Sequence, residues 1–147
     1  MASSSKSVDQ WIDMVGDYYK KLPELPKNGK DIVVSITPWL AIVFGVLGVI
    51  GSLVGLGIFT FLAPFALLSG VRETSQGILI VLLGLISSIL MVAAFPGTKN
   101  KQQKGWKLLY YSEVVSLVSN LVTFSVVGVV FTLVGFYFLY QIRSYYR

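Results

Sequence analysis

Residues 32–71 contain no Asp, Glu, Lys or Arg, and this stretch limits the fold more than any other feature of the chain. A membrane-spanning helix needs about 20 apolar residues. As one straight helix, the 40 residues would measure about 60 Å, roughly twice the hydrocarbon thickness of a bilayer. We therefore expect the stretch to break at the glycine-rich sequence 51–57, leaving a full-length segment 32–50 and a short segment 58–71.

Two further uncharged runs follow, residues 74–98 and 114–142. Charged residues make up only 13% of the chain, whereas soluble domains carry about 25%. Because so little polar surface cannot cover a water-exposed globule, we predict an all-α integral membrane helical bundle over residues 32–147. Four hydrophobic helical segments are expected, the second of them short and with its crossing left open: about 32–50, 58–71, 74–98 and 108–142.

The first 31 residues are predicted to form an N-terminal element of their own. Seven apolar side chains recur there at helical spacing, and charged side chains occupy the opposite face. Pro23 and Pro26 follow and end the pattern. The prediction is an amphipathic helix over residues 7–22, lying on a membrane or on a partner, and then a Pro/Lys linker to residue 31. The apolar stripe consists of Val8, Trp11, Ile12, Val15, Tyr18, Tyr19 and Leu22.

Lysine and arginine counts predict which loops face the cytoplasm. With a cytoplasmic N-terminus and a segment 58–71 that does not cross, nine of the 12 Lys and Arg residues lie inside, including the basic loop 99–107. With four crossings the split is eight to four, and that loop lies outside. We favour the first arrangement. The residues expected to contact the membrane surface and its anionic lipids are Trp11, Lys99, Lys101, Lys104 and Lys107.

Small and polar residues recur on single faces of the apolar segments. Glycines seven residues apart share a helix face and permit close approach of two backbones. We expect packing within one chain rather than homodimerisation from the pairs Gly48 and Gly55, Gly77 and Gly84, and Gly128 and Gly135. A polar stripe on the last segment either hydrogen-bonds neighbouring helices, which we favour, or lines a solute path. It consists of Glu113, Ser116, Asn120 and Thr123.

The chain contains no Cys and no His. This composition excludes thiolate and imidazole catalysis, disulfides and Cys/His metal sites. We predict no enzyme activity, no catalytic residue, no cofactor, no metal site and no binding to nucleic acid. The expected partners are the lipid bilayer, anionic lipids, and a second copy of the chain or other membrane proteins.

The C-terminal third contains the sequences AFPGTK (94–99), GWKLLYY (105–111) and QIRSYY (141–146). Together they resemble an uncharacterised group of small polytopic bacterial membrane proteins. The resemblance implies a multi-pass protein of the bacterial plasma membrane and carries no assigned activity. We therefore expect a non-catalytic membrane protein that organises or supports a membrane assembly. The alternatives are a small channel or facilitator subunit and a membrane-shaping protein.

Overall fold

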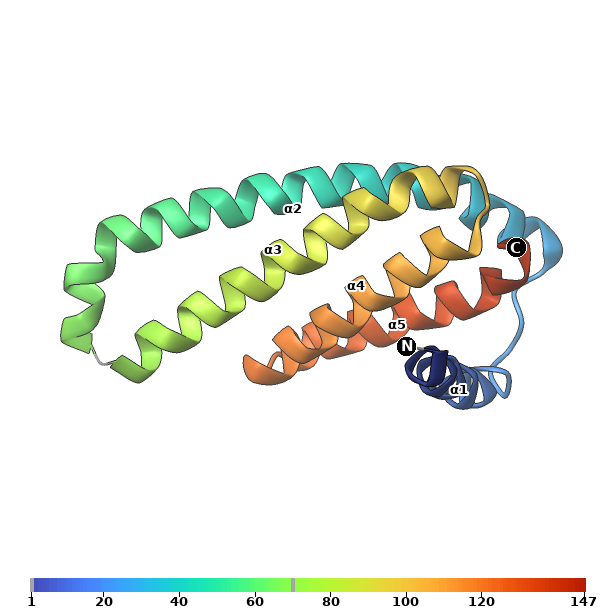
Figure 1. Ribbon diagram of the computed structural model, residues 1–147, viewed down its shortest axis with the longest axis horizontal. Helices are drawn as coiled ribbons and strands as arrows, with labels where there is room; N and C mark the ends of the chain where they lie inside the picture. Colours follow the sequence, from blue (N-terminus) through green and yellow to red (C-terminus); the bar gives the residue numbers. More distant parts are fainter. Residues whose placement is uncertain (1, 70) are drawn as a thin grey trace.

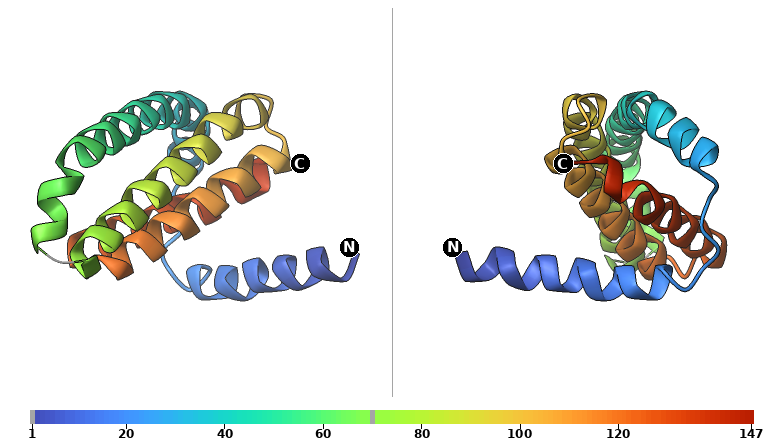
Figure 2. Two further views of the ribbon diagram at one scale, coloured as in Figure 1. Left: turned by 60° about the vertical axis from the view of Figure 1, so that its left-hand side comes forward. Right: turned by 90° about the vertical axis from the view of Figure 1, so that its right-hand side faces the viewer.

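The computed structural model describes residues 2–69 and 71–147, and the described residues fold into five α-helices and a short 3-10 helix. Helices α2 to α5 run alternately in opposite directions along an elongated bundle, and α1 crosses that bundle near one end (Figures 1 and 2). The all-helical fold is confirmed. The helices are α1 (Ala2–Tyr19), α2 (Lys27–Ser69), α3 (Val71–Lys99), α4 (Gln103–Val122) and α5 (Val126–Ile142), with η1 at Arg143–Tyr145.

Three helices of the described chain are long and apolar enough to cross a membrane. The candidate spans are Lys27–Phe65, Ser75–Lys99 and Val126–Tyr145. Helix α2 begins directly after Pro26, whose carbonyl accepts the first helical hydrogen bond from Lys30 N at 3.0 Å. The linker between α1 and α2 is therefore shorter than the predicted one, which extended to residue 31.

The expected break of the first apolar stretch at residues 51–57 is wrong, because α2 runs through it as one helix of 43 residues. An unsatisfied backbone group in hydrocarbon costs several kcal/mol, whereas a helical glycine costs only about 1 kcal/mol relative to alanine. Continuity of the helix is the cheaper outcome. Most of the expected segment 58–71 is thus the tail of α2, which contains Pro64 and turns toward α3 (Figure 1). Helix α2 ends at Ser69 and α3 begins at Val71, and residue 70 lies outside the described residues.

The last predicted segment, 108–142, was expected to be one helix, but the structure has a hairpin of two helices there. Helix α4 ends at Val122, and Phe124 has a positive φ of 52°. Ser125 caps α5 by accepting a hydrogen bond from Gly128 N at 3.1 Å. Ser125 N in turn donates to Asn120 O at 2.9 Å. These local bonds satisfy backbone groups that the ends of the two helices leave free.

The most tightly packed region lies where α2 begins, α3 ends, α4 begins and α5 ends. We call this the basic end of the bundle. The Trp106 side chain is 1% exposed there, and its Nε1 donates to Leu139 O at 2.7 Å. Phe136 and Tyr110 pack edge to face beside it. Ile12 of α1 belongs to the same core and is also 1% exposed, so α1 is part of the folded unit.

Candidate functional site: the docked helix α1 and the polar helix α4

Helix α1 is held at the basic end by two ion pairs and by a hydrogen bond from a tyrosine hydroxyl to its backbone. Asp9 Oδ1 lies 2.7 Å from Lys107 Nζ, and Asp13 Oδ1 lies 2.7 Å from an Arg143 guanidinium nitrogen. The Tyr140 hydroxyl donates to Ile12 O at 2.8 Å. The Arg143 guanidinium also lies over the Trp106 ring at 5.3 Å. Both ion pairs are partly exposed, so each contributes only a modest amount to stability. Their main effect is to set the orientation of α1.

The apolar stripe predicted on α1 is divided between two environments. One part faces the bundle and comprises Val8, Ile12 and Tyr19. The other part is open, with exposed fractions of 64% for Trp11 and 70% for Tyr18. The paired carboxylates lie on a third face, toward the basic end. Helix α1 therefore has a bundle face, an acidic face and a free apolar face. The free apolar face consists of Trp11, Met14 and Tyr18, and Leu22 continues it just beyond the end of the helix.

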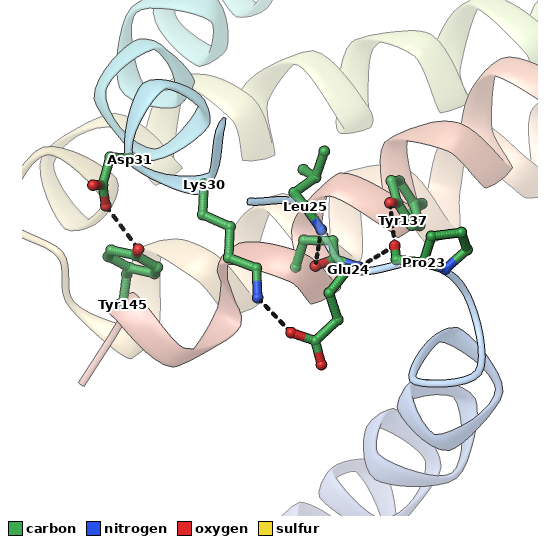
Figure 3. A network of polar contacts seen from close by, with 8 residues as sticks. Pro23, Glu24, Leu25, Lys30, Asp31, Tyr137 and Tyr145 are labelled. Atoms are coloured by element: carbon green, nitrogen blue, oxygen red, sulfur yellow. Dashed lines mark hydrogen bonds and ion pairs between the residues drawn. The ribbon is translucent and has the colours of Figure 1, made fainter. Parts of the chain in front are cut away.

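The linker after α1 is tied to the outer side of α5 (Figure 3). The Tyr137 hydroxyl donates to Pro23 O at 2.6 Å, and Leu25 N donates to Gln141 Oε1 at 3.3 Å. Tyr19 stacks on Tyr140 at 5.1 Å and donates to Leu133 O at 3.3 Å. Burial raises the pKa of the Tyr19 phenol. These contacts hold the end of α1 against the middle of α5.

The polar stripe predicted on α4 is shared between two neighbouring helices. Ser116 Oγ lies 2.9 Å from Ser87 Oγ of α3, and Ser112 Oγ lies 2.8 Å from the same atom. Asn120 faces α5, where its Nδ2 donates to Thr132 Oγ1 at 3.0 Å. Thr123 donates to carbonyl oxygens of α4 itself at the hairpin turn. Ser112, Ser116 and Asn120 therefore bond neighbouring helices, whereas Thr123 bonds only its own helix. Ser87 was missed, although the pair Ser87-Ser88 interrupts an otherwise apolar run.

Glu113 is the exception in the polar stripe. Its carboxylate packs against Gly135 of α5, where an added Cβ would lie 2.9 Å from Oε1. Among the described residues it has no hydrogen bond or ion pair. Beside the Glu113 carboxylate lies a cavity of about 120 Å³, which is lined by side chains from α2, α3 and α5, including Thr37 and Met91. Glu113 lies midway along α4, between Gln103 and Val122.

Four of the six predicted packing glycines lie at close helix contacts, and two do not. A Cβ at Gly48 would clash with Ser88, and one at Gly128 would clash with Asn120. Gly77 and Gly135 leave similarly little room, whereas Gly55 and Gly84 have ordinary van der Waals space. The closest approach of two backbones at the described glycines was not predicted. It joins Gly97 of α3 to Gly105 of α4, where a Cβ on Gly97 would lie 2.6 Å from Gly105 Cα.

The predicted surface residues also divide into two groups. Trp11, Lys99, Lys101 and Lys104 are exposed, and the Lys99 ammonium lies over the Phe95 ring at 5.8 Å. Lys107 is instead partly buried in its ion pair with Asp9. It therefore docks α1 and is not a free surface cation. Among the described residues, no three His, Cys, Asp or Glu side chains are grouped so as to hold a metal ion.

The apolar spans and the inward-facing polar side chains are those of a helical membrane protein. Comparisons of the chain with protein-family models, with curated proteins and with solved structures find no match. The resemblance to small polytopic bacterial membrane proteins therefore stays a prediction.

Proposed function

We propose that this chain is a non-catalytic membrane protein that supports a membrane assembly by presenting α1 as a fixed helix at the cytoplasmic surface of the bilayer. The observation that carries the proposal is the docking of α1 across the bundle. The acidic face of α1 is neutralised by Lys107 and Arg143. Its free apolar face keeps Trp11 and Tyr18 exposed. A helix with these faces, lying across a bundle, suits the boundary between headgroups and acyl chains.

A four-crossing arrangement supports this placement, and it differs from the one counted on the sequence because α2, α3, α4 and α5 each cross once and the basic loop 99–107 lies inside. Helix α4 is antiparallel to α5, and we take α4, which is not among the three candidate spans, as the return crossing before α5. Both ends of the chain then lie on one side of the membrane. Of the 12 Lys and Arg residues, 11 belong to that side, and only Arg72, at the start of α3, belongs to the other. This asymmetry exceeds the nine-to-three split counted for three crossings and favours a cytoplasmic basic end.

The free apolar face of α1 provides the test. The variant Trp11→Asp places a charge where apolar contact with the membrane or with the assembly is proposed, and charge burial is costly. We expect wild-type protein extracted in gentle detergent to migrate as a larger assembly. Trp11→Asp should migrate as the free chain, as measured by size-exclusion chromatography with mass determination.

Gln10→Asp is the matched control, because it adds the same charge at an exposed position next to Trp11 on α1. It should preserve the assembly. A wild-type chain that migrates alone, or two variants that behave alike, would contradict the proposed function.

Glu113 favours a second candidate, a small channel or facilitator subunit. An ionisable side chain within a membrane bundle marks a solute or proton path in many transporters. On the leading proposal, purified protein in vesicles leaves permeability at the protein-free level, and Asn120→Leu changes stability by about 0.6 kcal/mol, the average for such a hydrogen bond. A solute flux through the wild type that disappears in folded Asn120→Leu would favour the channel function over the leading proposal. Tubulation of the vesicles by wild-type protein would favour the membrane-shaping function.

A further inference from the structure

A groove of about 540 Å³ lies beneath the end of α1, on the outer face of α5. Its α5 wall is formed by Val130, Leu133 and Val134, whose spacing places them on one helix face. Its roof is formed by Tyr18 of the free apolar face of α1 and by Leu22 just beyond the end of that helix. The volume falls within the range of small-molecule sites, and the lining is apolar side chains and tyrosine rings.

The walls of this groove are held in place. Tyr19 is fixed between its stack on Tyr140 and its hydrogen bond to Leu133 O. Tyr137 lines the groove and is bonded to Pro23 O of the linker. These contacts fix the distance between the end of α1 and the face of α5. The groove between them is therefore part of the folded structure.

A lysine side chain that forms no ion pair with a described residue lies at the edge of the groove. The Lys21 ammonium lies 5.7 Å from the centre of the Tyr18 ring, and Tyr18 lines the groove. Among the described residues Lys21 is in no ion pair. Its neighbour Lys20 is different, because it binds Asp17 at 2.7 Å and thereby lowers the pKa of that carboxyl. Positive charge is thus free at the point where the apolar groove meets the surface.

We propose that the groove binds one anionic phospholipid, with an acyl chain along α5 beneath α1 and the phosphate at Lys21. The groove wall belongs to a candidate membrane span, so acyl chains are the molecules that surround it. The rim charge is complementary to a lipid phosphate. The site rests on the membrane orientation proposed above and adds a lipid class to it.

The test measures lipids retained by the purified full-length chain after delipidation, by native mass spectrometry, with phosphatidylglycerol and phosphatidylcholine supplied at equal concentration. We expect wild-type protein to retain one phosphatidylglycerol. Val134→Trp fills the groove and should lose that lipid. Val127→Trp is the matched control, because it lies two helical turns away on the same face of α5, is exposed, and does not line the groove. It should keep the lipid.

The charge is tested separately. Lys21→Gln should lower the preference for phosphatidylglycerol over phosphatidylcholine about fivefold, the factor for one lysine near an anionic surface. Lys6→Gln, at an exposed position of α1 outside the groove, should leave the preference unchanged. Equal retention by Val134→Trp and Val127→Trp, or no lipid on the wild type, overturns the site. A second polypeptide held in the groove instead of lipid also overturns it.

These outcomes separate the two proposals. If no lipid is retained while Trp11→Asp still disperses the assembly, the groove proposal fails and the proposed function stands. If the lipid is retained but the assembly is absent, the proposed function fails and the lipid site stands.

Discussion

Replacing Gly105 with alanine is expected to destabilise the protein more than any other single methyl addition among its described glycines. The added Cβ would lie 2.7 Å from Gly97 Cα and would clash with the Gly97 carbonyl carbon and with Thr98 N. All three atoms belong to the backbone, so no side chain can rotate away. Overpacking costs about 1–3 kcal/mol and occasionally more, and we expect the upper part of that range. Thermal unfolding of the purified protein in detergent measures the effect.

Gly51→Ala is the control for this prediction. Nothing lies within 4 Å of a Cβ at Gly51, and alanine is favoured over glycine in a helix by about 1 kcal/mol. The control should therefore be neutral or stabilising. Gly105→Ala as stable as Gly51→Ala would contradict the close crossing of α3 and α4 at the basic end.

Cysteine labelling in intact cells that express the protein should give an all-or-none result for the orientation. The chain has no native cysteine, so single cysteines at Gln102, Thr123 and Ser144 report without background. All three positions are exposed. If α2, α3, α4 and α5 each cross the membrane once, Gln102→Cys and Ser144→Cys resist a membrane-impermeant maleimide until the cells are opened. Thr123→Cys, at the α4–α5 turn, is labelled from outside.

The Ser144 position separates this arrangement from the one favoured on the sequence. Three crossings place residue 144 outside with the basic loop inside, so external labelling of Ser144→Cys with protection of Gln102→Cys would restore that arrangement. Labelling of Gln102→Cys in intact cells would overturn both. Only cysteine variants that migrate like the wild type on size-exclusion chromatography are compared. A misfolded variant would expose every position to the maleimide.

The candidate site was only partly predictable. The spacing from Val8 to Leu22 was enough to predict a helix, and the structure has α1 in that region. That spacing did not indicate that Ile12 would be buried in the bundle while Trp11 stays exposed. The division depends on Tyr140 and Arg143, which lie more than 120 positions away in the sequence. A hydrophobic pattern shows that a helix face is buried in apolar surroundings, but it does not show whether lipid or other helices cover that face.

The sequence by itself determined the helical class and the presence of apolar spans, but not the bounds of those spans. Both follow from local hydropathy and from the need to satisfy backbone groups within lipid. The tertiary structure alone decided where the chain turns. Gly51 to Gly57 do not break α2, whereas Thr123 to Ser125 do separate α4 from α5. A glycine in a long helix remains helical when hydrocarbon or a neighbouring helix surrounds it. A polar cluster ends a helix when its side chains can bond the freed backbone groups, as Ser125 does for Gly128. This bond joins residues only three positions apart, but hydropathy over the uncharged run 114–142 does not encode it. The packing of α4 against α5, such as Asn120 against Thr132, shows that the chain turns there.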